Sequence, residues 1–100
     1  MAEEKEIKDI IIEIQKLYRK GYNLKTDKEI FYHLLRQISK HVEKLKELKE
    51  DKDKEDLFKR EVADLYLLSL GLIELEKVNK DTIKASTDYY LNKVKENSKK

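Results

Sequence analysis

The stretch EVADLYLLSLGLIEL, residues 61–75, places a carboxylate, Asp64, inside one of the most apolar runs of the chain. Apolar and aromatic residues at positions 62, 63 and 65–68 surround it. A buried unpaired charge is strongly unfavourable, so Asp64 needs a basic side chain, a proton or a metal ion as its partner. The identity of that partner decides what this part of the molecule does.

The composition favours helices and excludes several classes of protein. The 100 residues suffice for one small domain, and 23 basic against 21 acidic residues give a net charge of +2. That near balance argues against nucleic-acid binding, which usually comes with a clear basic excess. Proline and cysteine are absent and glycine occurs twice, so helices are favoured and thiolate metal sites are excluded. We therefore expect residues 1–100 to form a single helical domain.

The hydropathy of the chain bears on its location. No run of 18 apolar residues is present, so we expect no membrane span. The opening MAEEKEIKD lacks the basic start and apolar centre of a signal peptide. We expect a cytoplasmic protein, and the 44% of charged residues, mostly lysine and glutamate, is also typical of thermophiles.

Hydrophobic periodicity predicts an all-α fold. Four helices are expected at about residues 4–20, 27–50, 54–78 and 82–97. The middle of the third is apolar on nearly every side, and such a helix needs cover on several sides. Four short helices cannot easily supply that cover. We therefore expect a four-helix bundle-like domain that forms a homodimer or a higher homo-oligomer.

The second predicted helix carries a seam of seven-residue period, which is suited to packing against an antiparallel neighbour. The seam consists of Phe31, Leu34, Ile38, His41, Leu45 and Leu48. Thr26 and Glu29 have the spacing of a capping box at the start of this helix. After the charged turn, Asp51 or Asp53 is the expected N-cap of the third helix.

Glu61 and Asp64 lie three residues apart and share one face of the third helix. They can offer two oxygens to a hard cation such as Mg²⁺. If the turn centres near residue 52, antiparallel pairing sets residue i opposite roughly 104 minus i. Glu43 then faces Glu61, and Lys40 faces Asp64. The partner of Asp64 is therefore either a metal ion, with Glu43 assisting, or Lys40, and spacing alone leaves both open.

Other residues with chemical potential have simpler interpretations. His41 lies in the apolar seam, where a packed, hydrogen-bonded histidine is more common than a metal ligand. His33 is expected to be exposed. Tyr89 and Tyr90 suit a core or an interface better than base stacking. The chain has no glycine-rich phosphate loop and no nucleophilic triad, so no catalytic residue is assigned.

Two motifs and their order resemble those of the MazG-like all-α nucleoside triphosphate pyrophosphohydrolases. EVADLYLLSL, residues 61–70, is similar to the ExxD helix of that family, and KVKENSKK, residues 93–100, is similar to its closing pattern. The resemblance implies hydrolysis of a nucleoside triphosphate to a monophosphate and pyrophosphate with Mg²⁺ or Mn²⁺. It also implies that Glu61 and Asp64 bind the metal and that Lys93 and Asn97 hold phosphate or sugar.

The EExxE motif of that family departs from its pattern here. One register places RQISK, residues 36–40, on the motif, so that Arg36 and Lys40 stand where carboxylates are expected. A later register restores two acids, Glu43 and Glu47, and keeps Lys44 between them. In the active form of the family, Glu43 and Glu47 would complete the metal site.

Two functions therefore remain open at this point, beside a helical interaction module of other ancestry. The first is a metal-dependent pyrophosphohydrolase. The second is an inactive, dimeric family member that binds an anionic ligand through Arg36, Lys40 and Lys93. Because each register puts a lysine into the acidic motif, we favour Lys40 as the partner of Asp64. Asp64→Asn and Lys40→Met would then each destabilise the protein by an amount on the order of 3 kcal/mol.

Overall fold

The computed structural model describes residues 2–99, with side chains from residue 6 onward. The elements in this range are α1 (Ala2–Gly21), α2 (Asp27–Lys49), a 3₁₀ turn (Lys52–Lys54), α3 (Glu55–Leu75) and α4 (Lys80–Ser98). The chain is 87% helical and residues 2–99 contain no strand, which confirms the prediction of an all-α fold with four helices. Among the described residues, no helix is both long enough and apolar enough to cross a membrane.

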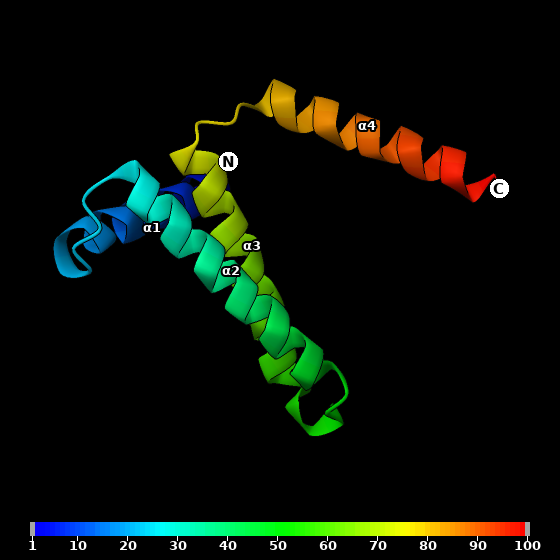
Figure 1. The fold of residues 1–100 in the computed structure, drawn as a ribbon, viewed down its shortest axis with the longest axis horizontal. Coiled ribbons are helices and arrows are strands. Elements are labelled where there is room, and N and C mark those ends of the chain that lie inside the picture. The colour runs from blue at the N-terminus through cyan, green and yellow to red at the C-terminus, as the bar shows by residue number, and fades with distance from the viewer. Residues whose placement is uncertain (1, 100) are drawn as a thin grey trace.

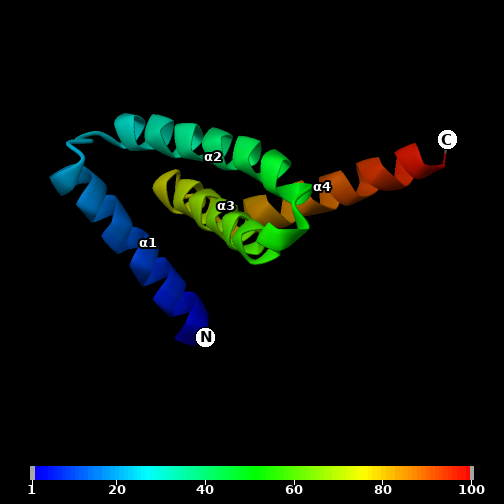
Figure 2. The ribbon, with the colours of Figure 1, turned by 90° about the horizontal axis from the view of Figure 1, so that it is seen from below.

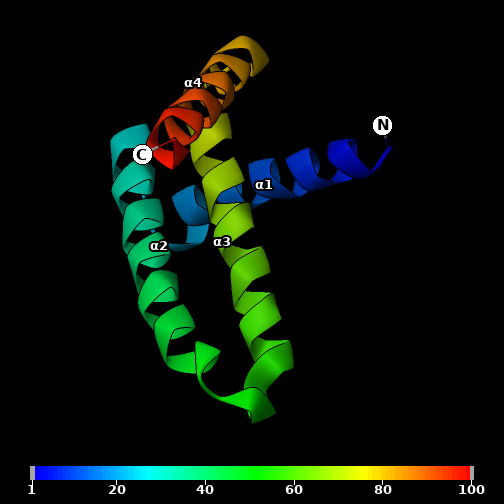
Figure 3. The same ribbon diagram turned by 90° about the vertical axis from the view of Figure 1, so that its right-hand side faces the viewer.

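Helices α2 and α3 form an antiparallel hairpin, and α1 crosses α3 at an angle (Figures 1 and 3). The predicted seam of α2 is confirmed, since all six of its side chains are buried or half-buried. The most enclosed residue is Ile30, with none of its surface exposed, and it packs with Leu34 and Leu75. The centre of the core thus lies where the start of α2 meets the end of α3.

Helix α1 contacts the last turns of α3 through a hydrogen bond and an ion pair. The side-chain amide of Gln15 donates a hydrogen bond of 3.1 Å to the carbonyl oxygen of Gly71. Closer to the start of α1, Lys8 Nζ lies 4.0 Å from a carboxylate oxygen of Glu74. These contacts place α1 beside the open end of the α2–α3 hairpin, and the three helices line a pocket between them.

Side-chain caps fix the starts of α2 and α4. The predicted capping box is confirmed: Thr26 Oγ1 accepts from the Glu29 amide at 3.1 Å, and Glu29 Oε1 accepts from the Thr26 amide at 3.2 Å. Asn79 Oδ1 accepts from the Thr82 amide at 2.8 Å. Asp51 caps the 3₁₀ turn rather than α3, because its Oδ1 accepts from the Asp53 amide. Helix α3 therefore begins without a side-chain cap.

Helix α3 ends at Leu75, three residues before the predicted boundary. Lys77 adopts a left-handed conformation with φ of 54°, and the Val78 amide donates to the Ile73 carbonyl at 3.0 Å. This is the hydrogen bond that closes a Schellman motif, which stops a helix by satisfying its last carbonyls. Lysine is an uncommon residue at such a position, so the helix end cannot be recognised from the residue type.

Helix α4 extends away from the other three helices (Figures 1 and 2). Every residue of α4 is exposed, including those on its apolar face, which we define as Ile83, Tyr90, Leu91 and Val94. The expectation that four helices share one bundle is therefore wrong for the described chain, in which α1, α2 and α3 pack together and α4 does not join them. A helix of this length gains most of its stability from packing, so α4 lacks its main source of support.

Candidate metal centre

The antiparallel pairing of α2 and α3 brings His41 opposite Glu61 and Asp64. His41 Nε2 lies 3.1 Å from Glu61 Oε2 and 3.5 Å from Asp64 Oδ2. The donor atoms of these three residues all lie within 4.8 Å of one another. The i, i+3 spacing of the two acids puts both carboxylates on the face of α3 that meets His41.

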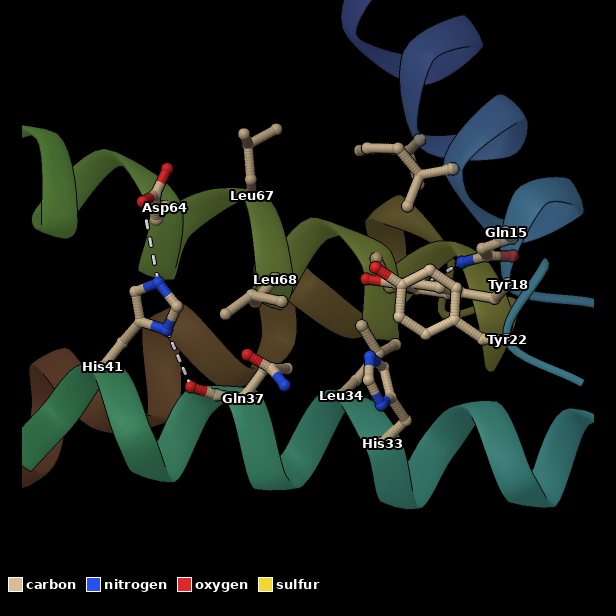
Figure 4. Close-up of a pocket in the computed structure, with 13 residues that line it drawn as sticks. Gln15, Tyr18, Tyr22, His33, Leu34, Gln37, His41, Asp64, Leu67 and Leu68 are labelled. Atoms are coloured by element: carbon tan, nitrogen blue, oxygen red, sulfur yellow. Dashed lines mark hydrogen bonds and ion pairs between the residues drawn. The ribbon is translucent and has the colours of Figure 1, made fainter. Parts of the chain in front are cut away.

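The orientation of the His41 ring is set by α2 itself. His41 Nδ1 lies 2.8 Å from the carbonyl oxygen of Gln37 (Figure 4). A carbonyl oxygen only accepts hydrogen bonds, so Nδ1 carries the hydrogen and donates it. In the neutral ring Nε2 then presents a lone pair to two carboxylates. That arrangement is repulsive unless a proton or a metal ion lies between the three groups.

The burial of Glu61 makes the same cluster electrostatically demanding. Its side chain is 14% exposed, and its buried Oε2 atom accepts no hydrogen bond. His41 Nε2 lies 3.1 Å away, but in the neutral ring that donates from Nδ1 it has no hydrogen to give to this oxygen. Buried carboxylate oxygens almost always have a partner, because leaving one unsatisfied costs about 1–3 kcal/mol or more. The cluster therefore has the composition of a site that either a proton on His41 or a divalent cation would stabilise.

A pocket of about 300 Å³ begins at this cluster and runs between α1, α2 and α3 (Figure 4). Between its two ends the wall is mainly aliphatic, with the glutamine side chains at 15 and 37 as polar exceptions. His41 and Asp64 form one end. The full lining is Ile11, Ile14, Gln15, Tyr18, Tyr22, His33, Leu34, Gln37, His41, Asp64, Leu67, Leu68 and Gly71.

The opposite end of the pocket is aromatic. The ring of Tyr18 meets the ring of His33 edge to face at a centroid distance of 4.7 Å, and it meets that of Tyr22 at 5.4 Å. Burial lowers the pKa of His33 below its ordinary 6.5, and the positive charges of Arg36 and Lys40 lower it further. Burial raises the pKa of the Tyr18 hydroxyl, with a smaller effect from Tyr22. This end of the pocket is therefore uncharged at neutral pH.

The acids expected to complete the metal site lie elsewhere on α2. Glu43 is exposed and pairs with Lys46 at 3.3 Å, and Glu47 is also exposed. Lys40, the favoured partner of Asp64, is exposed, and among residues 6–99 it forms no ion pair with that carboxylate. Asp64 faces His41 instead, so the expectation of a lysine partner does not agree with the structure.

The closing motif also lies apart from the pocket. Lys93 and Asn97 are exposed on α4, and neither lines the cavity. Within one copy of the chain, the structure thus brings together Glu61 and Asp64 but not the residues expected to hold phosphate or sugar.

The residue that sequence reasoning undervalued is His41. Its position in the seam between Ile38 and Leu45 already indicated that it faces α3, whereas Lys40 and Glu43 are off the seam. The aromatic end of the pocket was not expected, because Tyr18 and His33 come from different helices and no short motif joins them. Comparison of the chain with family models, with curated proteins and with solved structures finds no match.

Proposed function

We propose that the protein binds a nucleoside triphosphate together with a divalent cation and hydrolyses it to a monophosphate and pyrophosphate. The observation that carries the proposal is the convergence of His41, Glu61 and Asp64 at one end of an apolar pocket that is aromatic at the other. A cation at the cluster would suit the phosphates, and the apolar wall would suit the base. The MazG-like resemblance of residues 61–70 supports the same reaction.

The chemistry of such a site follows from its ligands. A divalent cation supplies charge neutralisation of the triphosphate and a lowered pKa for an attacking water. His41, Glu61 and Asp64 would hold the cation by three protein atoms, a number that leaves positions for water and for phosphate oxygens. The Asp64 side chain is 40% exposed and lines the pocket, so the open positions would face the substrate.

The rest of the pocket offers a place for the base. A volume of about 300 Å³ lies at the lower end of the range for small-molecule sites. The edges of Tyr18 and His33 and the aliphatic side chains would contact a planar ring. Gln15 is engaged by Gly71, whereas the amide of Gln37 faces the pocket and can donate to or accept from a base edge (Figure 4).

A second candidate function is the binding of an anionic ligand without hydrolysis, by a family member that has lost activity. Two observations favour it. Glu43 and Glu47 face solvent, so the cluster has only two carboxylates. Arg36 and Lys40 are exposed on α2 and attract anions rather than cations. This candidate predicts nucleotide binding with no release of pyrophosphate.

We further propose that the working form is a homodimer. A compact monomer of this mass exposes about 6,000 Å² of surface. The chain exposes 8598 Å². The excess over a compact monomer is about the total area that an extensive protein–protein interface buries on its two partners. The excess includes the apolar face of α4 and apolar side chains of α3, among them Val62 and Tyr66. Pairing two copies through these surfaces would cover them and would give α4 a neighbour.

The test of the enzymatic proposal is a screen of standard and modified nucleoside triphosphates with Mg²⁺ or Mn²⁺. Pyrophosphate and monophosphate are measured together, because their equal release distinguishes cleavage at the α-phosphate from simple phosphatase activity. Asp64→Asn is the inactive control, and Glu43→Gln is the matched carboxylate change outside the cluster. Turnover that depends on metal and on Asp64 but not on Glu43 would support the proposal. Binding without turnover of any of these nucleotides would favour the second candidate.

A further inference from the structure

The donor set of the cluster contains a nitrogen, which distinguishes it from an all-carboxylate magnesium site. Mg²⁺ prefers oxygen ligands in octahedral geometry and keeps much of its water. Imidazole nitrogen suits first-row transition ions, and Mn²⁺ and Zn²⁺ both accept imidazole together with carboxylate. We propose that His41 makes this cluster a site for a transition divalent cation of the Mn²⁺ and Zn²⁺ class, in preference to Mg²⁺.

Two of the three pairs of donor atoms lie at separations typical of ligands that share one ion. Two ligands held about 2.1 Å from one ion lie about 3.0 Å apart at a right angle and about 3.4 Å apart at a tetrahedral angle. The Nε2 atom of His41 lies 3.1 Å from Glu61 Oε2 and 3.5 Å from Asp64 Oδ2. The two carboxylates lie within 4.8 Å of each other, so a shared ion requires an adjustment of their side chains.

The surroundings of His41 are those of a metal-bound histidine. Its Nδ1 atom donates to the Gln37 carbonyl, the kind of outer contact that fixes the tautomer and leaves Nε2 free to bind a metal. Glu61 contributes a second observation: its buried Oε2 accepts no hydrogen bond, and it lies 3.1 Å from the same His41 Nε2 atom. The nearby basic residue of α2, Lys40, is exposed and pairs with neither acid.

The role of the cation in hydrolysis rests on the proposed function, but the preference for one metal over another does not. It is tested by binding of metal alone, on the full chain freed of metal by chelation and without nucleotide. Pulsed electron paramagnetic resonance of bound Mn²⁺ detects a directly coordinated nitrogen, and calorimetry gives the affinities for Zn²⁺ and Mg²⁺. The variants are His41→Gln, which removes the nitrogen, and His41→Glu, which replaces it by a carboxylate. His33→Gln is the matched control, because His33 lines the same pocket outside the cluster.

The expected result is nitrogen coupling to Mn²⁺ in the wild type and in His33→Gln, and none in His41→Gln. Zn²⁺ affinity should fall on the order of 100-fold or more in His41→Gln. Loss of an outer contact alone costs up to about 100-fold, and His41 is proposed to bind the metal directly. His41→Glu should lower the ratio of Zn²⁺ to Mg²⁺ affinity. Circular dichroism checks that each variant is folded. If His41→Gln is unfolded, the inference is still tested by the nitrogen coupling of Mn²⁺ in the wild type and by the metal affinities of His41→Glu.

Absence of nitrogen coupling in the wild type, or equal Zn²⁺ affinity in the wild type and a folded His41→Gln, would overturn the inference. The outcome is separable from that of the proposed function. The predicted metal preference without nucleotide hydrolysis would support the metal site and reject the enzyme. Hydrolysis with Mg²⁺ that is indifferent to His41→Gln would support the enzyme and reject the role of His41.

Discussion

A single hydrogen bond determines what His41 can do. Because Nδ1 donates to the Gln37 carbonyl, Nε2 is the atom that meets Glu61 and Asp64. The sequence places His41 on the face toward α3, but Lys40 is its immediate neighbour, and a rotation of α2 by one residue would exchange them. Periodicity predicts which helices pair, and it does not fix the side-chain direction that this choice requires.

The pocket contains a histidine whose protonation opposes folding. The folded pKa of His33 lies below its ordinary 6.5, so the unfolded chain binds the proton first as the pH falls. His33 therefore contributes stability that is present above pH 6.5 and is lost as the pH falls toward its folded pKa. Chemical denaturation across this range should show a smaller loss of unfolding free energy in His33→Gln than in the wild type. Parallel pH profiles for the two proteins would contradict this prediction.

At the scale of elements, the capping box of α2 is a stability determinant that can be predicted from four residues of sequence. Thr26→Ala removes the acceptor for the Glu29 amide and should cost about 1 kcal/mol. The melting temperature should then fall by roughly 4–8 °C for a domain of this size. Ser69→Ala is the control, because the Ser69 hydroxyl bonds only to the Leu65 carbonyl within α3. An equal effect of the two changes would show that the cap is not the cause.

Gly71 lies inside α3, where glycine costs up to about 1 kcal/mol relative to alanine. A Cβ atom there would meet the methyl groups of Leu34 at 3.7 Å, an ordinary van der Waals distance. Gly71→Ala should therefore raise the free energy of unfolding by up to about 1 kcal/mol in urea denaturation. Gly21→Ala, at the end of α1, should give a smaller gain, and destabilisation by Gly71→Ala would show that α2 and α3 cannot accept the methyl group.

The sequence predicts helices better than it predicts their ends and contacts. The seam of α2 and the Thr26 cap follow from spacing and side-chain chemistry, and both are observed. The predicted end of α3 lies too far along the chain. The helix stops at a left-handed residue, and this residue is Lys77 and not the glycine or asparagine that usually marks such a stop. The pocket needs the angle at which α1 crosses α3, which no local pattern encodes.

The molecule as a whole is more extended than its length requires. Its radius of gyration is 16.4 Å, against about 13 Å for a compact chain of 100 residues. Helix α4 is the cause, since it runs away from the other helices (Figure 2). Its apolar face is exposed to solvent. The apolar pattern of α3 predicted a partner subunit. The structure shows that the apolar face of α4 is also exposed.

Sedimentation should give a mass of twice 12.0 kDa or more at tens of micromolar. Val94→Lys puts a charge on the apolar face of α4 and should weaken the dimer and reduce helicity, because α4 loses its packing. Asn92→Lys makes the matched change on the opposite side of α4 and should leave the dimer intact. A wild-type monomer at these concentrations, or equal effects of the two variants, would contradict the proposed assembly.

The most direct measurement of the candidate metal centre is thermal melting of the metal-free protein with and without Mn²⁺, on the wild type, Asp64→Asn and His41→Gln. A ligand that binds only the folded chain stabilises it by about 2.7 kcal/mol at one hundred times its Kd. We predict a rise of several degrees in the wild type that is lost in both variants. No rise in the wild type, or the same rise in all three proteins, would show that His41, Glu61 and Asp64 do not hold a metal ion.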